Sequence, residues 1–123
     1  MKTILIADDD KNLTLLYAQE LTDEGYQVDV VHDARQAIER VAQNPPDLLI
    51  LDIRMPGMDG IEALGHILGK NNRLPVILNT AYTNYKDNFM TWSADAYVVK
   101  SSDLSELKET IARLLKKAEA DKA

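Results

Sequence analysis

The chain has 123 residues, a formal net charge of −6, an isoelectric point near 4.8 and no cysteine. The acidic balance argues against direct nucleic-acid binding, which uses basic surfaces, and the lack of cysteine excludes disulfides and thiolate metal sites. With 46% hydrophobic residues, a chain of this length can bury one core, so we expect a single domain over residues 1–123.

The N-terminal sequence MKTILIADDD has too short an apolar stretch for a signal peptide, and three acids follow it at once. No apolar run elsewhere approaches the length of a membrane span. The simplest expectation is a cytoplasmic protein that makes no contact with a membrane.

Short apolar runs alternate along the chain with longer amphipathic segments. In chain order, the pattern predicts a strand over 3–7, a helix over 11–24, a strand over 26–31, a helix over 33–44, a strand over 47–51, a helix over 59–70, a strand over 75–80, a short helix over 84–92, a strand over 96–100 and a final helix from Asp103. Five strands alternating with five helices predict a parallel α/β sheet that is covered on both faces.

Acidic residues mark several predicted helix starts. Asp10 precedes the first helix, and Asp33 with Gln36 has the spacing of a capping box. Asp103 with Glu106 has the same spacing before the final helix. Each aspartate is therefore expected to accept a hydrogen bond from the first turn of its helix.

Polar residues follow the predicted strands at their carboxyl ends. Asp8 and Asp9 follow the first strand, Asp52 follows the third, and Thr80 and Lys100 end the fourth and fifth. In a parallel sheet these ends meet at one edge, where ligands bind in the crevice at which the strand order reverses. Any one of these residues alone would be an ordinary strand-end or helix-cap residue, but together they indicate a site.

Converging carboxylates indicate a hard cation, and Mg²⁺ takes one or two carboxylates together with a phosphate. Repulsion between Asp8, Asp9 and Asp52 would be relieved by such a cation. A carboxylate beside a metal, with a lysine and a hydroxyl nearby, suits phosphoryl transfer to an aspartate. We therefore expect Asp52 to be the nucleophile, with Lys100 and Thr80 binding the transferred group.

Four segments, ILIADDD, DLLILDIRMPGMDG, VILNTAY and ADAYVVK, occur in an order and spacing that resemble the receiver domain of bacterial two-component response regulators, of the chemotaxis or phosphorelay single-domain type. The resemblance covers essentially the whole chain. It implies a flavodoxin-like, doubly wound (βα)5 fold with a five-stranded parallel sheet in the order 2-1-3-4-5.

The resemblance also implies roles for the acidic residues. Asp52 would accept phosphate from a sensor histidine kinase or a histidine phosphotransfer protein. Asp9 and Asp52 would bind Mg²⁺ directly, with help from the backbone carbonyl of Arg54, and Asp8 would act mainly through water. The only enzymatic chemistry implied is self-phosphorylation and autodephosphorylation.

For the remaining site residues, the resemblance implies a switch. Thr80 and Lys100 would bind the phosphoryl group, and Tyr97 would follow Thr80 as a rotameric aromatic residue. The surface formed by the fourth helix, fifth strand and fifth helix would then change and alter binding to a downstream effector. The domain would be a monomer or a weak phosphorylation-dependent dimer.

Two positions depart from the family pattern. Ser101 follows Lys100, where the family usually has a proline in a cis peptide bond, and a non-proline cis bond costs about 2.5–4 kcal/mol. Arg54 and Tyr82 are bulky residues two positions beyond Asp52 and Thr80. Such side chains overhang the phosphoryl group in the family, which predicts a fairly long-lived phosphate.

Three alternatives remain open at this stage. A flavin-binding electron carrier can share the fold, but the acids of DDDKN would repel the flavin phosphate. A degenerate receiver could act as a phosphorylation-independent interaction module. The chain could also be the N-terminal fragment of a multidomain transcriptional regulator.

Overall fold

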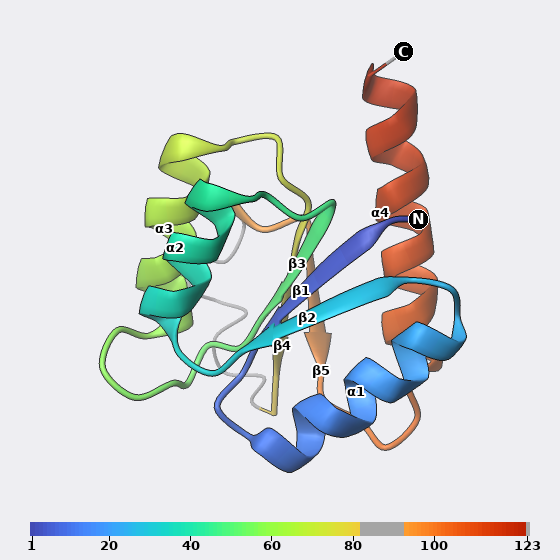
Figure 1. Cartoon of the computed structure of the whole chain (residues 1–123), viewed down its shortest axis with the longest axis horizontal. Helices are drawn as coiled ribbons and strands as arrows, with labels where there is room; N and C mark the ends of the chain where they lie inside the picture. The colour runs from blue at the N-terminus through green and yellow to red at the C-terminus, as the bar shows by residue number, and fades with distance from the viewer. Residues whose placement is uncertain (82–92, 123) are drawn as a thin grey trace.

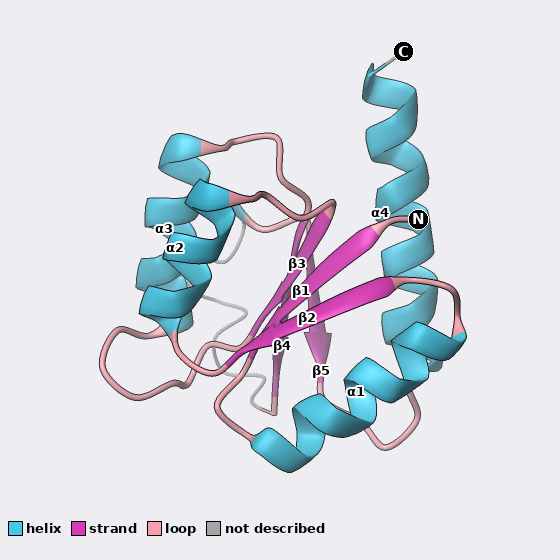
Figure 2. Cartoon of the chain, viewed as in Figure 1, coloured by secondary structure: helices cyan, strands magenta, loops and turns pink. Residues whose placement is uncertain are grey.

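The computed structural model describes residues 1–81 and 93–122. Its elements, in chain order, are β1 (Thr3–Ala7), α1 (Lys11–Asp23), β2 (Gln27–Val31), α2 (Ala34–Gln43), β3 (Leu48–Leu51), α3 (Gly60–Lys70), β4 (Val76–Thr80), β5 (Ala96–Val99) and α4 (Ser105–Lys122). Figures 1 and 2 show these helices and strands around one central sheet. The helix predicted over 84–92, with Tyr85, Phe89 and Trp92, lies outside the described residues.

All four strand pairings in the described sheet are parallel, and the strand order is β2-β1-β3-β4-β5. This confirms the predicted fold class and strand order. The strands β3 and β4 are buried along their whole length, which explains why LLIL and VILNT read as continuous apolar runs rather than alternating ones.

Two hydrophobic clusters cover the two faces of the sheet. Helices α2 and α3 pack on one face, which we call the α2/α3 face, and α1 and α4 pack on the other, the α1/α4 face (Figure 1). Because side chains alternate along a strand, Ile50 packs on the α1/α4 face and Leu49 and Leu51 pack on the α2/α3 face. The predicted covering of both faces is therefore confirmed.

The same alternation fixes where the strand-end residues point. Ile6, Ile50, Ile77 and Val98 all belong to the cluster of the α1/α4 face. The residues two positions further along the four strands are therefore directed to that same face at the carboxyl edge. These four residues are Asp8, Asp52, Asn79 and Lys100. Thr80 follows Leu78 and is directed to the α2/α3 face.

Backbone hydrogen bonds extend the sheet beyond the formal strand ends. The Asp8 amide donates to the Val31 carbonyl at 3.1 Å, the Asp52 amide to Ala7 at 2.9 Å and the Lys100 amide to Thr80 at 2.8 Å. The strand-end side chains are therefore fixed by the sheet rather than carried on free loops.

The predicted helix caps are found with two differences. Asp10 and Asp33 accept from the amides of Leu13 and Gln36, as expected. The Gln36 side chain accepts from the amide of His32 rather than from Asp33, so the box is shifted by one residue. Asp103 also accepts from the first turn of its helix, but its Oδ1 accepts from the Ser105 amide at 2.9 Å and from the Ser105 hydroxyl at 2.6 Å, so the bonds involve Ser105 in place of Glu106.

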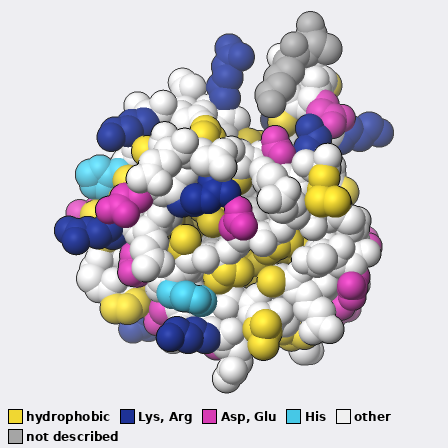
Figure 3. Space-filling model, viewed as in Figure 1, with side chains coloured by type: hydrophobic (Ala, Val, Ile, Leu, Met, Phe, Trp, Pro, Cys, Tyr) yellow, Lys and Arg dark blue, Asp and Glu magenta, His cyan; other side chains and the backbone are white. Residues whose placement is uncertain are grey.

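Strand β2 forms one edge of the sheet. Figure 3 shows hydrophobic side chains near the middle of the face on which β2 lies, with charged groups of both signs dispersed around them. In β2, the half-buried Asp29 pairs with Arg40 of α2, with 2.5 Å between Oδ2 and NH2.

Among the described residues, no helix is long and apolar enough to cross a membrane.

Candidate functional site

The predicted acidic residues converge at the carboxyl edge of the sheet. One carboxylate oxygen from each of Asp8, Asp9 and Asp52 lies within 4.8 Å of the others. Asp8 and Asp52 are only 3% and 5% exposed, whereas Asp9 is open to solvent. The group therefore has two buried carboxylates, Asp8 and Asp52, and one exposed carboxylate, Asp9.

The backbone around Asp8 holds its carboxylate in place. Asp8 Oδ1 accepts a hydrogen bond from the Asp10 amide at 2.9 Å, and Asp10 in turn caps α1. The Asp8 carbonyl lies 3.1 Å from Nδ1 of His32, at the end of β2. The turn that starts α1 thus ties Asp8 to β1 and β2 and leaves its second carboxylate oxygen, Oδ2, directed at the site.

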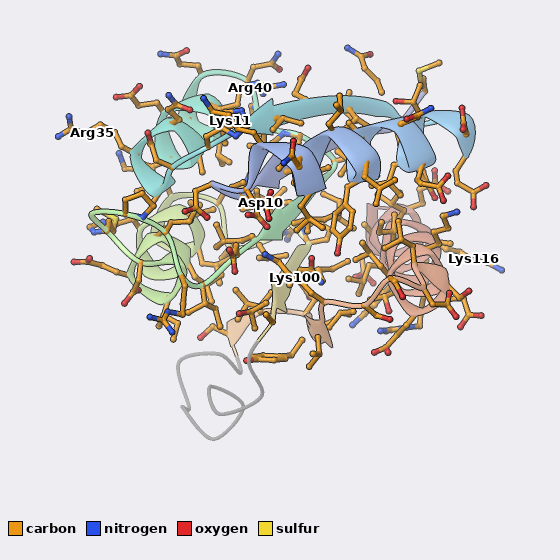
Figure 4. The ribbon with its side chains drawn as sticks, turned by 90° about the horizontal axis from the view of Figure 1, so that it is seen from below. Asp10, Lys11, Arg35, Arg40, Lys100 and Lys116 are labelled. Atoms are coloured by element: carbon orange, nitrogen blue, oxygen red, sulfur yellow. The ribbon has the colours of Figure 1, made fainter. Side chains whose placement is uncertain are left out.

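Lys100 joins the two buried carboxylates. Its Nζ lies 2.7 Å from Asp8 Oδ2 and 3.3 Å from Asp52 Oδ2. In Figure 4, which looks onto the carboxyl edge, Lys100 lies near the centre, whereas Arg35 and Lys116 lie at the periphery. The prediction that the third and fifth strands deliver Asp52 and Lys100 to one place is confirmed as a matter of geometry.

Burial and the neighbouring charges perturb this cluster. Burial raises the pKa of Asp52 and the negative charge of Asp8 raises it further, against the opposing effect of Lys100. Burial acts to lower the pKa of Lys100, but its bonds and attraction to Asp8 and Asp52 outweigh that effect, so its pKa is raised. Two carboxylates and one ammonium leave an excess negative charge that a second cation would neutralise.

Asp52→Asn is expected to stabilise the metal-free protein at pH 7 by about 1 kcal/mol, because a neutral amide has a smaller burial cost. Since the pKa of Asp52 is raised above its ordinary 3.8 in the fold, wild-type stability contributed by this group is present at low pH and is lost as pH rises through the raised pKa. The difference between the two proteins should therefore grow from pH 4 to pH 7 in urea denaturation. A less stable variant at pH 7 would contradict this account.

The other predicted residues lie around the cluster. Thr80 is fully buried, and its carbonyl accepts from the Lys100 amide. Tyr97 is half-buried, is paired in register with Leu78 and packs against the core of the α2/α3 face. Arg54 is exposed, beyond Asp52. Tyr82, its predicted partner in shielding the phosphate, lies outside the described residues.

The loop after Lys100 is built without a cis bond, since the described residues contain no cis peptide. Ser101 Oγ accepts a hydrogen bond from the Asp103 amide at 3.1 Å. Ser101 thus organises the turn into α4 by a side-chain hydrogen bond. Lys100 therefore reaches both carboxylates from a trans peptide, although Ser101 stands where the family usually has proline.

Gly60 supports the site in a way that was not predicted. A Cβ at this position would lie 2.0 Å from the backbone oxygen of Asp52 and 2.8 Å from the Cα of Ile53. The Gly60 amide donates to the Ile53 carbonyl at 2.7 Å, and Asp59 caps the helix that follows. The sequence signal that could have indicated this contact is a glycine directly after the capping aspartate of α3.

Taken together, these features define a class of protein: a doubly wound α/β domain with an acidic cluster and a lysine at the point where its strand order reverses. Oxygen ligands with an adjacent ammonium can bind a hard divalent cation and a phosphoryl group.

Comparison with known proteins gives the family. The response regulator receiver domain matches residues 4–112, and the chain belongs to this family. This decides against the flavin-carrier alternative on the same fold.

The curated relatives are longer proteins. Response regulator ArlR of Staphylococcus saprophyticus is 34% identical over 119 residues, which cover 95% of this chain and 54% of the relative. The chain thus spans about half the length of this relative.

Solved structures agree with the family. Response regulator TrrA of Thermotoga maritima, in complex with Mg(2+)-BeF, has a TM-score of 0.91 and 42% identity, covering 93% of this chain and 99% of TrrA. A further structure contains TrrA with the histidine kinase ThkA, with 43% identity, a TM-score of 0.89 and coverage of 94% and 99%. A CheY-like receiver domain of Methanospirillum hungatei has a TM-score of 0.93 at 28% identity, covering 98% of each chain.

Proposed function

We propose that this domain is phosphorylated on Asp52 in a Mg²⁺-dependent reaction and transmits a two-component signal. The observation that carries the proposal is the convergence of Asp8, Asp9 and Asp52 on Lys100 at the carboxyl edge. Membership of the receiver family and the TrrA complex with Mg(2+)-BeF support it.

The donor set fits Mg²⁺. Three carboxylate oxygens within 4.8 Å of one another are hard ligands, and Asp9 faces solvent, where a hydrated cation can enter. Asp9 and Asp52 are proposed as direct ligands with the Arg54 carbonyl, and Asp8 as a ligand through water. When bound, the cation neutralises negative charge that gathers on the phosphoryl oxygens.

In the reaction, a carboxylate oxygen of Asp52 attacks the phosphorus of a phosphohistidine. A P–O bond to Asp52 forms as the P–N bond breaks, and the imidazole leaves with the electron pair and takes up a proton. Lys100 is already 3.3 Å from Asp52 Oδ2 and is proposed to bind one phosphoryl oxygen. The Thr80 hydroxyl is proposed to bind another.

The response is proposed to pass through Thr80 and Tyr97. Thr80 lies at the end of β4, and Tyr97 is its near neighbour on β5, in register with Leu78. Movement of Thr80 toward a phosphoryl group would open space beside the half-buried Tyr97 ring and change the surface formed with α4. The fourth predicted helix, which belongs to this surface in the family, lies outside the described residues.

The phosphate donor is proposed to be a sensor histidine kinase or a phosphotransfer protein, by analogy with the TrrA–ThkA complex. The proposed chemistry is confined to self-phosphorylation and autodephosphorylation, with no other substrate. A cytoplasmic location, a monomer or weak phosphorylation-dependent dimer and a separate downstream effector complete the proposal. Direct contact with nucleic acid by this domain is not expected from its charge of −6.

The test is incubation with Mg²⁺ and acetyl phosphate, followed by intact-mass measurement. We expect one phosphoryl group on the wild type and none on Asp52→Asn or on the wild type in EDTA. If acetyl phosphate fails, the same measurement with a histidine-phosphorylated kinase decides the outcome. Absence of phosphate with both donors, or phosphate on Asp52→Asn, would contradict the proposal.

A further inference from the structure

Two buried polar atoms near the carboxylate cluster have no hydrogen-bond partner among the described residues: the Tyr17 hydroxyl and Asn79 Oδ1. Tyr17 is 1% exposed and Asn79 is 3% exposed. The Asn79 amide nitrogen donates to the Val98 carbonyl at 2.9 Å, which fixes the orientation of the amide. Buried oxygens without donors are costly, so their retention beside a functional site calls for a physical reason.

Their position relates them to Lys100. Asn79 is in register with Val98 on one side, and, because Leu51 pairs with Leu78, it stands level with Asp52 on the other. Tyr17 packs from α1 on the same face. Burial raises the pKa of Tyr17, and the charges of Asp8 and Asp52 raise it further, while the positive charge of Lys100 and the neighbouring Asn79 amide act to lower it. The hydroxyl therefore lies beside Asn79 and within electrostatic reach of the ammonium.

Lys100 needs acceptors in more than one state. Its ammonium has three N–H donors, and here it contacts Oδ2 of Asp8 and Oδ2 of Asp52. These carboxylates belong to the set proposed to bind the cation. When these carboxylates bind a divalent cation, their ion pairs with the half-buried ammonium weaken. The ammonium then requires other oxygen acceptors to offset the cost of its burial.

We propose that Tyr17 and Asn79 are positioning residues for Lys100. The Tyr17 hydroxyl oxygen and Asn79 Oδ1 accept hydrogen bonds from the Lys100 ammonium when a divalent cation occupies the carboxylate cluster. The hydroxyl and amide oxygens are neutral, so they compete little with the carboxylates for the cation. Both residues line a cavity of about 280 Å³ that also touches Val99 and Ser101, the two chain neighbours of Lys100. The inference rests on the proposed cation site.

The test is the Mg²⁺ affinity of the unphosphorylated protein, measured by titration calorimetry. Tyr17→Phe keeps the ring and removes the acceptor, and we expect its Kd for Mg²⁺ to rise roughly tenfold, the effect of one charge-assisted hydrogen bond. Tyr26→Phe is the matched control, because Tyr26 packs against the same core cluster and its hydroxyl is not one of the two unpartnered atoms. Its Kd should equal that of the wild type. Asn79→Val should weaken binding to a similar degree.

A double-mutant cycle separates positioning from a structural role. In a Lys100→Met background there is no ammonium to accommodate, so Tyr17→Phe should leave Mg²⁺ affinity unchanged. Equal weakening in both backgrounds, or none in either, would overturn the inference. A wild type that binds no Mg²⁺ would instead overturn the proposed function.

A second measurement covers the case in which the Lys100→Met variants fail to fold. In ¹⁵N-lysine-labelled wild type, the Lys100 ammonium signal should shift on addition of Mg²⁺, and the Mg²⁺-bound position should differ in Tyr17→Phe but not in Tyr26→Phe. Identical bound positions in all three proteins would overturn the inference.

Discussion

Gly60→Ala is expected to lower the free energy of unfolding by about 3 kcal/mol or more, which is at the severe end for a single methyl group. The added Cβ would lie 2.0 Å from the Asp52 backbone oxygen, and neither backbone segment can yield without breaking the 2.7 Å bond from the Gly60 amide to Ile53. The measurement is urea denaturation followed by circular dichroism. Phosphorylation of the surviving folded protein should also slow, because the clash displaces Asp52.

The same helix supplies the matched control. Gly65 lies within α3, and an added Cβ there meets nothing within 4 Å. Gly65→Ala should therefore raise stability by up to about 1 kcal/mol through helix propensity alone. Similar effects of the two substitutions would show that the close approach of α3 to Asp52 is not what selects glycine at position 60.

Lys100→Met should lower the free energy of unfolding at pH 7 by about 3 kcal/mol, because it leaves two buried carboxylates without their ammonium. Lowering the pH should recover stability, since protonation of the carboxylates removes the repulsion between them. Magnesium should recover it as well by replacing the missing positive charge. The measurement is urea denaturation at pH 4 and pH 7, with and without Mg²⁺.

Lys108→Met is the control for loss of a lysine. Lys108 Nζ lies 3.5 Å from Glu20 Oε1 and 3.8 Å from Glu24 Oε1, and the side chains of both acids are more than 40% exposed. Its loss should cost no more than about 1 kcal/mol, with little dependence on Mg²⁺. If Lys100→Met proves as mild as Lys108→Met, the Asp8–Lys100–Asp52 group is not the electrostatic centre of the domain.

The fold was predictable because local and long-range signals agree. The buried runs of β3 and β4 and the helix caps at Asp10 and Asp33 pointed to one alternating pattern, and parallel topology then brought Asp8, Asp52 and Lys100 to one edge. What could not be predicted depends on contacts between distant segments. The closeness of Gly60 to the Asp52 backbone is one case.

Tyr17 and Asn79 show the same limit in the site. Tyr17 is a fully buried residue of α1. Its unpartnered hydroxyl and its proximity to Asn79 follow only from how the Tyr17 side chain packs against β4 and β5 residues on the α1/α4 face. Ser101 is a similar case, because its Oγ accepts from the Asp103 amide, a contact across the turn into α4 that a proline side chain could not make.

The ion pair at the edge strand bears on how the protein behaves at high concentration. An open strand edge can pair with the edge of another molecule and start aggregation. In β2, Asp29 lies in the middle of the strand and pairs with Arg40 of the adjacent helix. Edge-to-edge pairing of two copies would bring two such carboxylates out of water side by side, which disfavours self-association. The edge of β2, which is apolar on either side of Asp29, can thus stay exposed to solvent without making the domain prone to aggregation.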